Sequence, residues 1–187
     1  MRIISGNFKG KKILSPKDKS TRPLKDLTKE SIFNIIKHSN KFNINIEESN
    51  ILDLFSGVGS FGLECLSRGA STSTFVENYK EVLPILKKNI LNLNYLNNSS
   101  IIEKDIFDQL DFNNLKIEFD IIFMDPPYKE KRLHTLLKKI IESNILKKEG
   151  IFIIHRHKKE EDEFPNSFNL IEQKTYGISK IIFGYCA

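Results

Sequence analysis

The chain has 187 residues, of which 40% are hydrophobic and 28% are charged. This composition is ordinary for a globular protein, and the length suits one domain with a full core and a small appendage. No apolar run approaches the roughly 20 residues of a membrane-spanning helix, and two cysteines, Cys65 and Cys186, are too few for a disulfide framework or a metal cluster. We therefore expect a reduced, cytoplasmic protein with no membrane segment, acting as a monomer.

Positive charge is concentrated near the N-terminus. Residues 1–41 hold 11 Lys and Arg against 3 Asp and Glu, whereas residues 42–187 hold 18 against 21. A basic arm on a mildly acidic body favours nucleic-acid binding over a merely solvated surface, because phosphate contacts are electrostatic and local. We expect residues 1–41 to form an RNA-contacting extension and residues 42–187 the main domain. The candidate RNA contacts are Lys9, Lys11, Lys12 and Arg22.

The extension is expected to contain a hairpin and a helix. Residues 1–14 alternate short apolar pairs around Gly6 and Gly10, which predicts a small β-hairpin. Residues 17–22 are polar and read as a loop, and Pro23 stops any earlier helix. A helix is predicted from about residue 24 or 26 to His38, because apolar residues recur at helical spacing at Leu27, Ile32, Phe33, Ile35 and Ile36.

Strands and helices alternate in the main domain. Strands are predicted at 51–55, 72–76, 100–103, 119–124 and 151–155, and helices at 60–68, 79–92 and 131–144, with a short helical turn after Asp105. Two further strands, 168–176 and 178–185, meet at Gly177 and read as a hairpin. The alternation predicts an α/β fold with a mostly parallel sheet, right-handed crossovers and an antiparallel C-terminal edge.

A glycine-rich loop follows the first strand of this domain, in the segment Asp53-Leu54-Phe55-Ser56-Gly57-Val58-Gly59-Ser60-Phe61-Gly62. Its glycine spacing formally matches the dinucleotide fingerprint, which alone is a weak signal. Asp53 distinguishes between the possible ligands of this loop, because a carboxylate beside the turn would repel the pyrophosphate of a dinucleotide. S-adenosylmethionine has no phosphate and carries an ammonium and a sulfonium. We therefore expect a site for this methyl donor at Asp53, Phe55, Gly57 and Gly59, where glycine lets the backbone approach the ligand closely.

Two further acids follow the next strands. Glu77 ends the strand 72–76, 20 residues after Gly57, where an acid can accept both ribose hydroxyls. Asp105 follows the strand 100–103 and is expected to bond the adenine amine, with Ile106 packing on the ring. The alternative for each acid is a helix cap or a solvated strand end, and for Asp105 the two interpretations weigh about equally.

The segment Asp125-Pro126-Pro127-Tyr128 directly follows the strand 119–124. It therefore lies where open α/β sheets bind their ligands. An exocyclic base amine is a poor nucleophile, and two acceptors aimed at its N–H bonds favour the pyramidal nitrogen that can attack. Asp125 would supply a carboxylate and Pro126 a carbonyl, Pro127 would stiffen the turn, and Tyr128 would stack on the extruded base. The pattern favours methyl transfer to a nucleobase.

The histidines indicate no metal site, because His38, His134, His155 and His157 form no ligand set with the cysteines. We expect residues 155–157 to be a solvated strand end, although His155 could face the site, and residues 160–163 to form a surface loop.

With these motifs in place, the chain resembles the RsmD family, bacterial methyltransferases of guanine N2 in small-subunit ribosomal RNA. The resemblance covers essentially the whole length. It is carried by Met1-Arg2-Ile3-Ile4-Ser5-Gly6, Gly10-Lys11-Lys12-Ile13-Leu14, Thr21-Arg22-Pro23, Glu30-Ser31-Ile32-Phe33-Asn34, the glycine-rich loop with Leu63-Glu64, and Asp125-Pro126-Pro127-Tyr128. One segment departs, since the family usually continues Arg-Pro-Thr with Asp-Arg-x-Arg-Glu, and here Leu24, Leu27 and Lys29 replace the threonine and the two arginines.

The resemblance implies a seven-stranded class I (Rossmann-like) methyltransferase sheet and S-adenosylmethionine as cofactor, with S-adenosylhomocysteine as product and no metal. By resemblance, Asp53, Gly57, Gly59 and Glu77 bind the donor, and residues 125–128 hold the guanine. The implied partner is ribosomal RNA or an assembling small subunit. The alternatives are an adenine-N6 methyltransferase of DNA or RNA, since the same tetrapeptide serves that amine, and a nucleic-acid-binding module that has lost catalysis.

Overall fold

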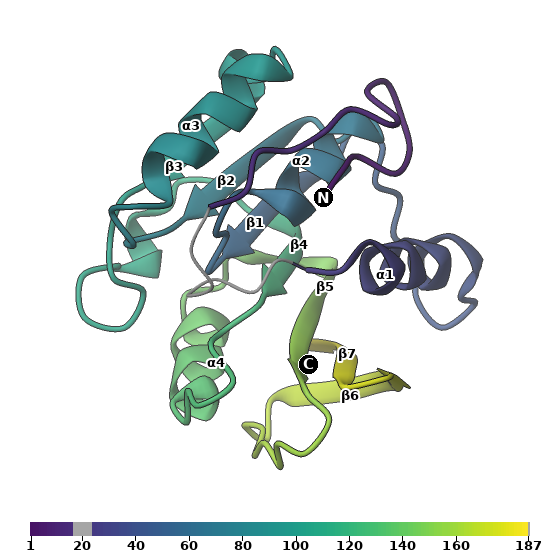
Figure 1. The fold of residues 1–187 in the computed structure, drawn as a ribbon. Coiled ribbons are helices and arrows are strands. Elements are labelled where there is room, and N and C mark those ends of the chain that lie inside the picture. Colours follow the sequence, from purple (N-terminus) through teal and green to yellow (C-terminus); the bar gives the residue numbers. More distant parts are fainter. Residues whose placement is uncertain (17–23, 187) are drawn as a thin grey trace.

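A seven-stranded sheet forms the centre of the computed structural model, which describes residues 1–16 and 24–186 (Figure 1). The strand order is β3-β2-β1-β4-β5-β7-β6. The first five strands are parallel, namely β1 (Asn50–Leu54), β2 (Thr72–Val76), β3 (Ser99–Ile102), β4 (Phe119–Met124) and β5 (Leu146–His157). The last two, β6 (Phe168–Tyr176) and β7 (Ser179–Cys186), form an antiparallel hairpin whose β7 pairs with β5. The predicted fold class is thereby confirmed.

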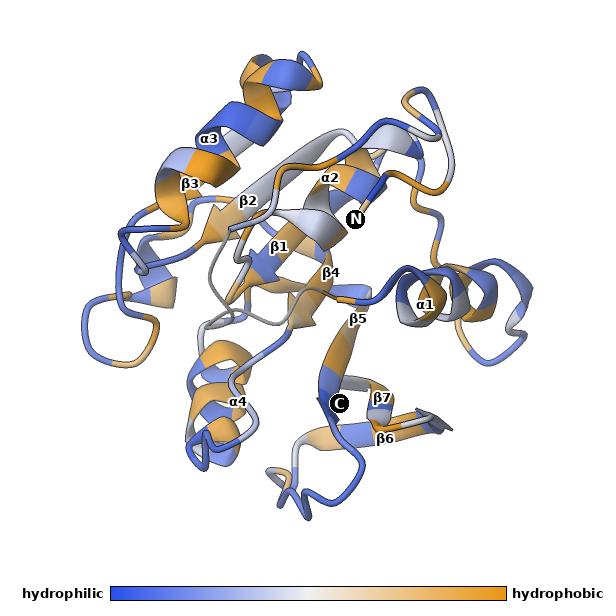
Figure 2. Cartoon of the chain, in the orientation of Figure 1, coloured by the Kyte–Doolittle hydropathy of each residue, from blue (hydrophilic) through white to orange (hydrophobic). Residues whose placement is uncertain are grey.

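Helices cover both faces of the sheet. The first face packs against α1 (Asp26–His38), α2 (Ser60–Ser67) and α3 (Leu83–Asn92), and the second packs against α4 (Leu133–Glu142) and the short 3-10 turn η2 (Phe112–Asn114). A second 3-10 turn, η1 (Leu96–Asn98), precedes β3. Because both faces are covered, β1 and β4 are buried along nearly their whole length. Figure 2 shows β4 as mostly hydrophobic, whereas β1 also carries hydrophilic positions. Of the helices described, none has the length and apolarity to cross a membrane.

Several element boundaries differ from the predictions by one or two residues, and two differ by more. The third helix begins at Leu83 rather than at residue 79, because Pro84 suits only the first helical turn, where its missing N–H is not needed. The fifth strand begins at Leu146 rather than at residue 151, because Leu146 already pairs with Phe119 at the start of β4. Residues 147–150 are polar or glycine, and the sequence pattern therefore did not indicate that the strand extends through them.

The N-terminal segment reverses direction as a hairpin. Its two arms are joined by one bridge, Arg2 with Lys12, and by three backbone hydrogen bonds, from the N–H groups of Ile3, Gly10 and Ile13 to carbonyls of the opposite arm. Other backbone groups of the segment bond to the main domain. The N–H groups of Ile4 and Ser5 donate to the Glu64 carboxylate at 2.7 and 2.9 Å. Further along, the N–H of Leu14 donates to the side chain of Asn89 on α3. The expected extension is therefore fastened to the main domain by buried polar contacts, and its Ile3 and Ile13 share the core of the first face.

Lys29 shows what the divergent segment does in this chain. Its side chain is fully buried, and its Nζ lies 3.3 Å from Glu64 and donates to the Arg2 carbonyl at 2.8 Å. Burial lowers the pKa of Lys29, and the charge of Glu64 opposes that shift. Lys29 thus joins α1, α2 and the N-terminal segment. Leu27 fits the helical spacing of the apolar residues, yet 70% of this residue is exposed.

Candidate active site at the carboxyl ends of the strands

The loops after β1 and β4 meet at the point where the strand order reverses. From β1 the chain continues outward through β2 and β3, and it returns to place β4 and β5 on the other side of β1. Open α/β sheets bind ligands in the crevice at such a switch point, outside the carboxyl ends of the strands. The glycine-rich loop follows β1 and the Asp125–Tyr128 turn follows β4, so both lie at this switch point. The structure therefore brings the two predicted motifs together.

The glycine-rich loop has an unusual backbone. Phe55 has a φ of 58°, which is rare for a residue with a side chain, and Gly57 and Gly59 have φ values of 55° and 82°. A Cβ added at Gly57 would meet no atom within 4 Å, whereas one added at Gly59 would lie 2.6 Å from the Leu86 side chain. Gly59 therefore serves close packing, and Gly57 presents bare backbone to open space. This is the geometry that close approach of a ligand requires.

Asp53 is buried beneath this loop, with 1% of the residue exposed. Its Oδ2 accepts a hydrogen bond of 2.9 Å from the N–H of Gly62, in the first turn of α2. Burial raises the pKa of the Asp53 carboxyl well above its ordinary value, against the effect of the Gly62 bond, and the charges of Asp125 and Glu77 raise it further. Three acidic side chains thus lie close together, and the raised pKa of Asp53 shows that a further negative charge is disfavoured there. The residues fit a ligand that brings positive charge and disfavour one that brings phosphate.

Glu77 and Asp105 both accept bonds from the chain itself. One Glu77 oxygen accepts from the N–H of Gly57 at 2.7 Å, and the other accepts from the N–H groups of Asn78 and Tyr79. Glu77 therefore ties the glycine-rich loop to the turn after β2. Asp105 accepts from the N–H groups of the two residues that start the next turn and from the side chain of Asn78. The capping interpretation of Asp105 thus describes its contacts in this structure.

Ile106 lies in the core beside these acids. It is 4% exposed and belongs to the apolar cluster on the α4 face. Phe55 is only partly buried, and its ring lies 5.9 Å from that of Phe107. The two rings form an apolar surface next to the glycine-rich loop. Their roles toward a cofactor stay predictions.

The turn after β4 is held rigidly. The N–H of Asp125 donates to the Leu54 carbonyl of β1 at 3.4 Å, which is the last backbone hydrogen bond between the two strands. The Asp125 side chain therefore starts directly from the end of the sheet. Pro126 is buried and Pro127 is exposed. The Pro127 carbonyl accepts from the N–H of Glu130 at 2.8 Å and from the Arg156 guanidinium at 3.2 Å. These two donors already engage that carbonyl, which agrees with the assignment of the Pro126 carbonyl as the second acceptor for an amine.

The expectation that His155 belongs to a solvated strand end is wrong. Its side chain is 7% exposed, and its Nδ1 lies 2.8 Å from Oδ1 of Asp125. Its Nε2 lies 2.9 Å from Oγ of Ser179 on β7. The ring of Tyr128 meets His155 and His157 edge to face, at 6.1 and 5.1 Å. Sequence reasoning missed this contact because the two residues are 30 positions apart, and only the pairing of β4 with β5 brings them together.

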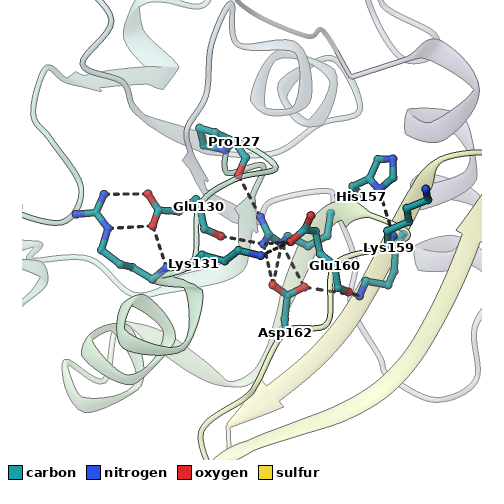
Figure 3. A network of polar contacts seen from close by, with 10 residues as sticks. Pro127, Glu130, Lys131, His157, Lys159, Glu160 and Asp162 are labelled. Carbon is teal, nitrogen blue, oxygen red and sulfur yellow. Dashed lines mark hydrogen bonds and ion pairs between the residues drawn. The ribbon is translucent and has the colours of Figure 1, made fainter.

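Arg156 supports the same turn from the other side of β5. Its side chain is 1% exposed and forms an ion pair of 2.8 Å with Asp162. It also donates to the carbonyls of Pro127 and Glu130, and Lys180 of β7 donates to the Glu160 carbonyl (Figure 3). The segment 160–163 is therefore only partly the surface loop that we expected. Its Asp162 carboxylate turns inward and fixes the guanidinium that holds the turn after β4.

The candidate RNA contacts among the described residues, Lys9, Lys11 and Lys12, lie at the opposite end of the sheet. Helix α2 leaves the carboxyl end of β1 and runs back, and the turn between Gly6 and Gly10 packs against its last residue, Ser67 (Figure 1). Lys9 and Lys12 are exposed, and Lys11 donates to the carbonyl of Asn92 at the end of α3. Arg22 lies outside the described residues. Among the described residues, no three His, Cys, Asp or Glu side chains gather as a metal site would require.

The fold and the site together define a class I methyltransferase. A family model described as "Conserved hypothetical protein 95" matches residues 1–185. The chain therefore belongs to this family, the RsmD family that its motifs resemble.

Individual relatives agree with this membership. Ribosomal RNA small subunit methyltransferase D of Haemophilus influenzae is 32% identical over 179 residues, covering 95% of this chain and 90% of the relative. The protein of the same name from Buchnera aphidicola (strain APS) is 34% identical over 172 residues, covering 92% and 86%. A solved Escherichia coli structure, described as a candidate methyltransferase, has a TM-score of 0.80 at 26% identity and covers 98% of this chain and 96% of that one.

Proposed function

We propose that this protein transfers a methyl group from S-adenosylmethionine to the exocyclic N2 of a guanine in small-subunit (16S) ribosomal RNA. One observation carries the proposal: the acid-rich glycine loop after β1 and the Asp125–Tyr128 turn after β4 lie side by side at the switch point of the sheet, close enough for the charge of Asp125 to act on Asp53. Membership in the RsmD family supports ribosomal RNA as the substrate. We place the enzyme in the cytoplasm as a monomer that needs no metal.

The donor site is assigned to the acids and the open backbone. Asp53 and Glu77 supply negative charge, with Glu77 directed at the ribose. Gly57 allows close approach to the backbone, and Gly59, packed against Leu86, holds the loop in the shape that this approach needs. Phe55, Asp105 and Ile106 complete the assignment on the adenine side. When bound, the cofactor supplies an electrophilic methyl group on a positively charged sulfur. The protein's part is to hold that group in line with the attacking nitrogen.

The acceptor site is assigned to the turn after β4. The Asp125 carboxylate and the Pro126 carbonyl accept the two N–H bonds of the amine, which directs the nitrogen lone pair toward the methyl carbon. As the N–C bond forms, the electron pair of the S–C bond stays on sulfur, and the surplus proton of the nitrogen passes to Asp125. Tyr128 stacks on the extruded base, offsetting part of the cost of removing it from its helix.

RNA contact away from the target base is assigned to the N-terminal extension, residues 1–41. Lys9 and Lys12 are exposed there, and Lys11 lies over the ring of Phe8. Together with Arg22 they would bind phosphates. Because these lysines lie at the far end of α2, they would bind a part of the RNA distant from the modified guanine. Residues 1–41 and 42–187 share one hydrophobic core, so they are not separate folding units. The division at residue 41 instead separates two roles, RNA contact and methyl transfer.

Methyl transfer to purified RNA tests this function. Small-subunit RNA and assembled subunits from cells lacking the protein are incubated with labelled donor, and the nucleosides are identified by mass spectrometry. We expect N2-methylguanine in the wild type and its loss in Asp125→Asn, an isosteric change that turns an acceptor oxygen into a donor amide. Donor affinity should stay within about threefold, because Asp125 is assigned to the base. N6-methyladenine would instead establish the adenine enzyme, and undetectable donor binding would establish a binding module without catalysis.

A further inference from the structure

His155 is buried, polar and bonded at both ring nitrogens. Its Nδ1 meets Oδ1 of Asp125 at 2.8 Å, and its Nε2 meets Oγ of Ser179 at 2.9 Å. The three residues come from the end of β4, from β5 and from β7, and the two strand pairings bring them together. A histidine placed only to fill the core would not need two aligned polar partners. This arrangement therefore calls for a role beyond packing.

The chemistry of the partners assigns the ring protons. An ionised carboxylate only accepts hydrogen bonds, so Nδ1 must carry the proton that faces Asp125. In the neutral ring Nε2 then has a free lone pair and accepts from the Ser179 hydroxyl, which can rotate to donate. Ser179 is buried, so this second bond also fixes the plane of the ring. The two hydrogen bonds are thus donated in the same direction: Ser179 donates to His155, and His155 donates to the Asp125 carboxylate.

We propose that His155 is a positioning residue for methyl transfer, acting through Asp125. By holding Oδ1, the Nδ1–H fixes the rotation of the carboxylate and leaves Oδ2 to accept from the amine. This inference rests on the proposed function, because it gives Asp125 the task of accepting that N–H bond. Misplacing a reacting group by 1 Å lowers a rate by as much as about 100-fold. Losing the histidine donor should therefore affect turnover much more than binding.

A matched pair of amides separates a hydrogen-bonding role from a space-filling one. In His155→Asn the amide nitrogen is bonded to Cγ, as Nδ1 is, and can still donate to Asp125. In His155→Gln the amide lies one carbon further out, nearer the position of Nε2. His155→Leu removes both bonds, and His134→Leu, at an exposed histidine on α4, serves as the control. Thermal unfolding of each variant shows which of them are folded.

We expect kcat to fall at least about tenfold in His155→Leu and His155→Gln, and to stay within about threefold of wild type in His155→Asn and His134→Leu. KM for RNA and the donor Kd should change by less than about threefold in all four, because the lost interaction concerns the orientation of the reacting group. Unchanged kcat in folded His155→Leu would overturn the proposal. So would a loss in His155→Asn as large as in His155→Leu.

A measurement without substrate keeps this inference separate from the proposed function. In protein labelled with ¹⁵N at histidine, the His155 ring should show a protonated Nδ1 and an unprotonated Nε2, and its Nδ1 resonance should move in Asp125→Asn. The opposite tautomer would overturn the inference even if the enzyme methylates guanine. Wild-type protein that methylates no guanine would overturn the proposed function, and the ring spectrum would still decide the orientation of His155.

Discussion

Replacing Asp53 by Asn should make the protein more stable and weaken its hold on the methyl donor. The asparagine keeps an oxygen to accept the N–H bond of Gly62, so the loop after β1 keeps its anchor. The change removes a negative charge from a residue that is 1% exposed and close to Asp125 and Glu77. A hydrogen bond to a charged group contributes about 1.5–3 kcal/mol, so the donor Kd should rise roughly 10-fold to 150-fold.

The stability gain should depend on pH in a defined direction. Burial raises the pKa of Asp53 above its value in the unfolded chain. The folded protein therefore holds this proton more tightly, and wild-type stability from this group is lost as pH rises toward the raised pKa. Between the two pKa values the advantage of Asp53→Asn should grow by about 1.4 kcal/mol per pH unit, or roughly 3–5 °C in Tm for a domain of this size. It should vanish in acid below the unfolded pKa.

Two measurements check this reasoning. Calorimetric titration with S-adenosylmethionine at pH 8 gives the change in Kd, and thermal unfolding at several pH values from 4 to 9 gives the stability difference. Glu118→Gln is the matched control, because Glu118 is exposed and precedes β4 at the opposite end of the sheet. A Tm difference that does not vary with pH would refute the burial argument. An unchanged donor Kd would refute the assignment of Asp53 to the donor.

Two further substitutions test how the site is built. Arg156→Leu removes the guanidinium that lies 2.8 Å from the buried Asp162 carboxylate and leaves Lys180, at 3.6 Å, as its cationic partner. The free energy of unfolding in urea should fall by about 3 kcal/mol, the lower end for a broken buried ion pair. A loss no larger than that of Lys148→Leu, at an exposed cation on the same strand, would contradict this. Gly62→Ala places a methyl group 2.4 Å from the Phe75 ring. Overpacking of about 1–3 kcal/mol should outweigh the roughly 1 kcal/mol gained in helix propensity, and a variant more stable than wild type would show that the ring moves freely.

Local pattern was sufficient for the parts of the site that depend on one strand and its following loop. A buried apolar run followed by glycines, or by Asp125 and two prolines, places those residues at a strand's carboxyl end wherever the strand lies in the sheet. Asp105 shows the limit of this reasoning. Its position after β3 is as predicted, but its contacts are those of a cap, and a sequence pattern alone weighs both outcomes equally.

Contacts between distant parts of the chain could not be predicted from the sequence pattern. Lys29 reads as a surface cation on a helix, and its burial against Glu64 depends on how α1 crosses α2. Leu27 fits the helical spacing of the apolar residues on α1. It is nevertheless exposed, and this too depends on how α1 crosses α2.

The sequence by itself determined the order of the elements, the α/β class and the two motifs, because periodicity and turn residues act within a few positions of one another. Only the tertiary structure decided what holds the turn after β4 in place. His155 and Arg156 adjoin each other on β5, yet one bonds to the Asp125 carboxylate and the other to the Pro127 carbonyl. Alternate residues of a strand face opposite sides of its sheet, and the partners on each side depend on which strands lie next to it.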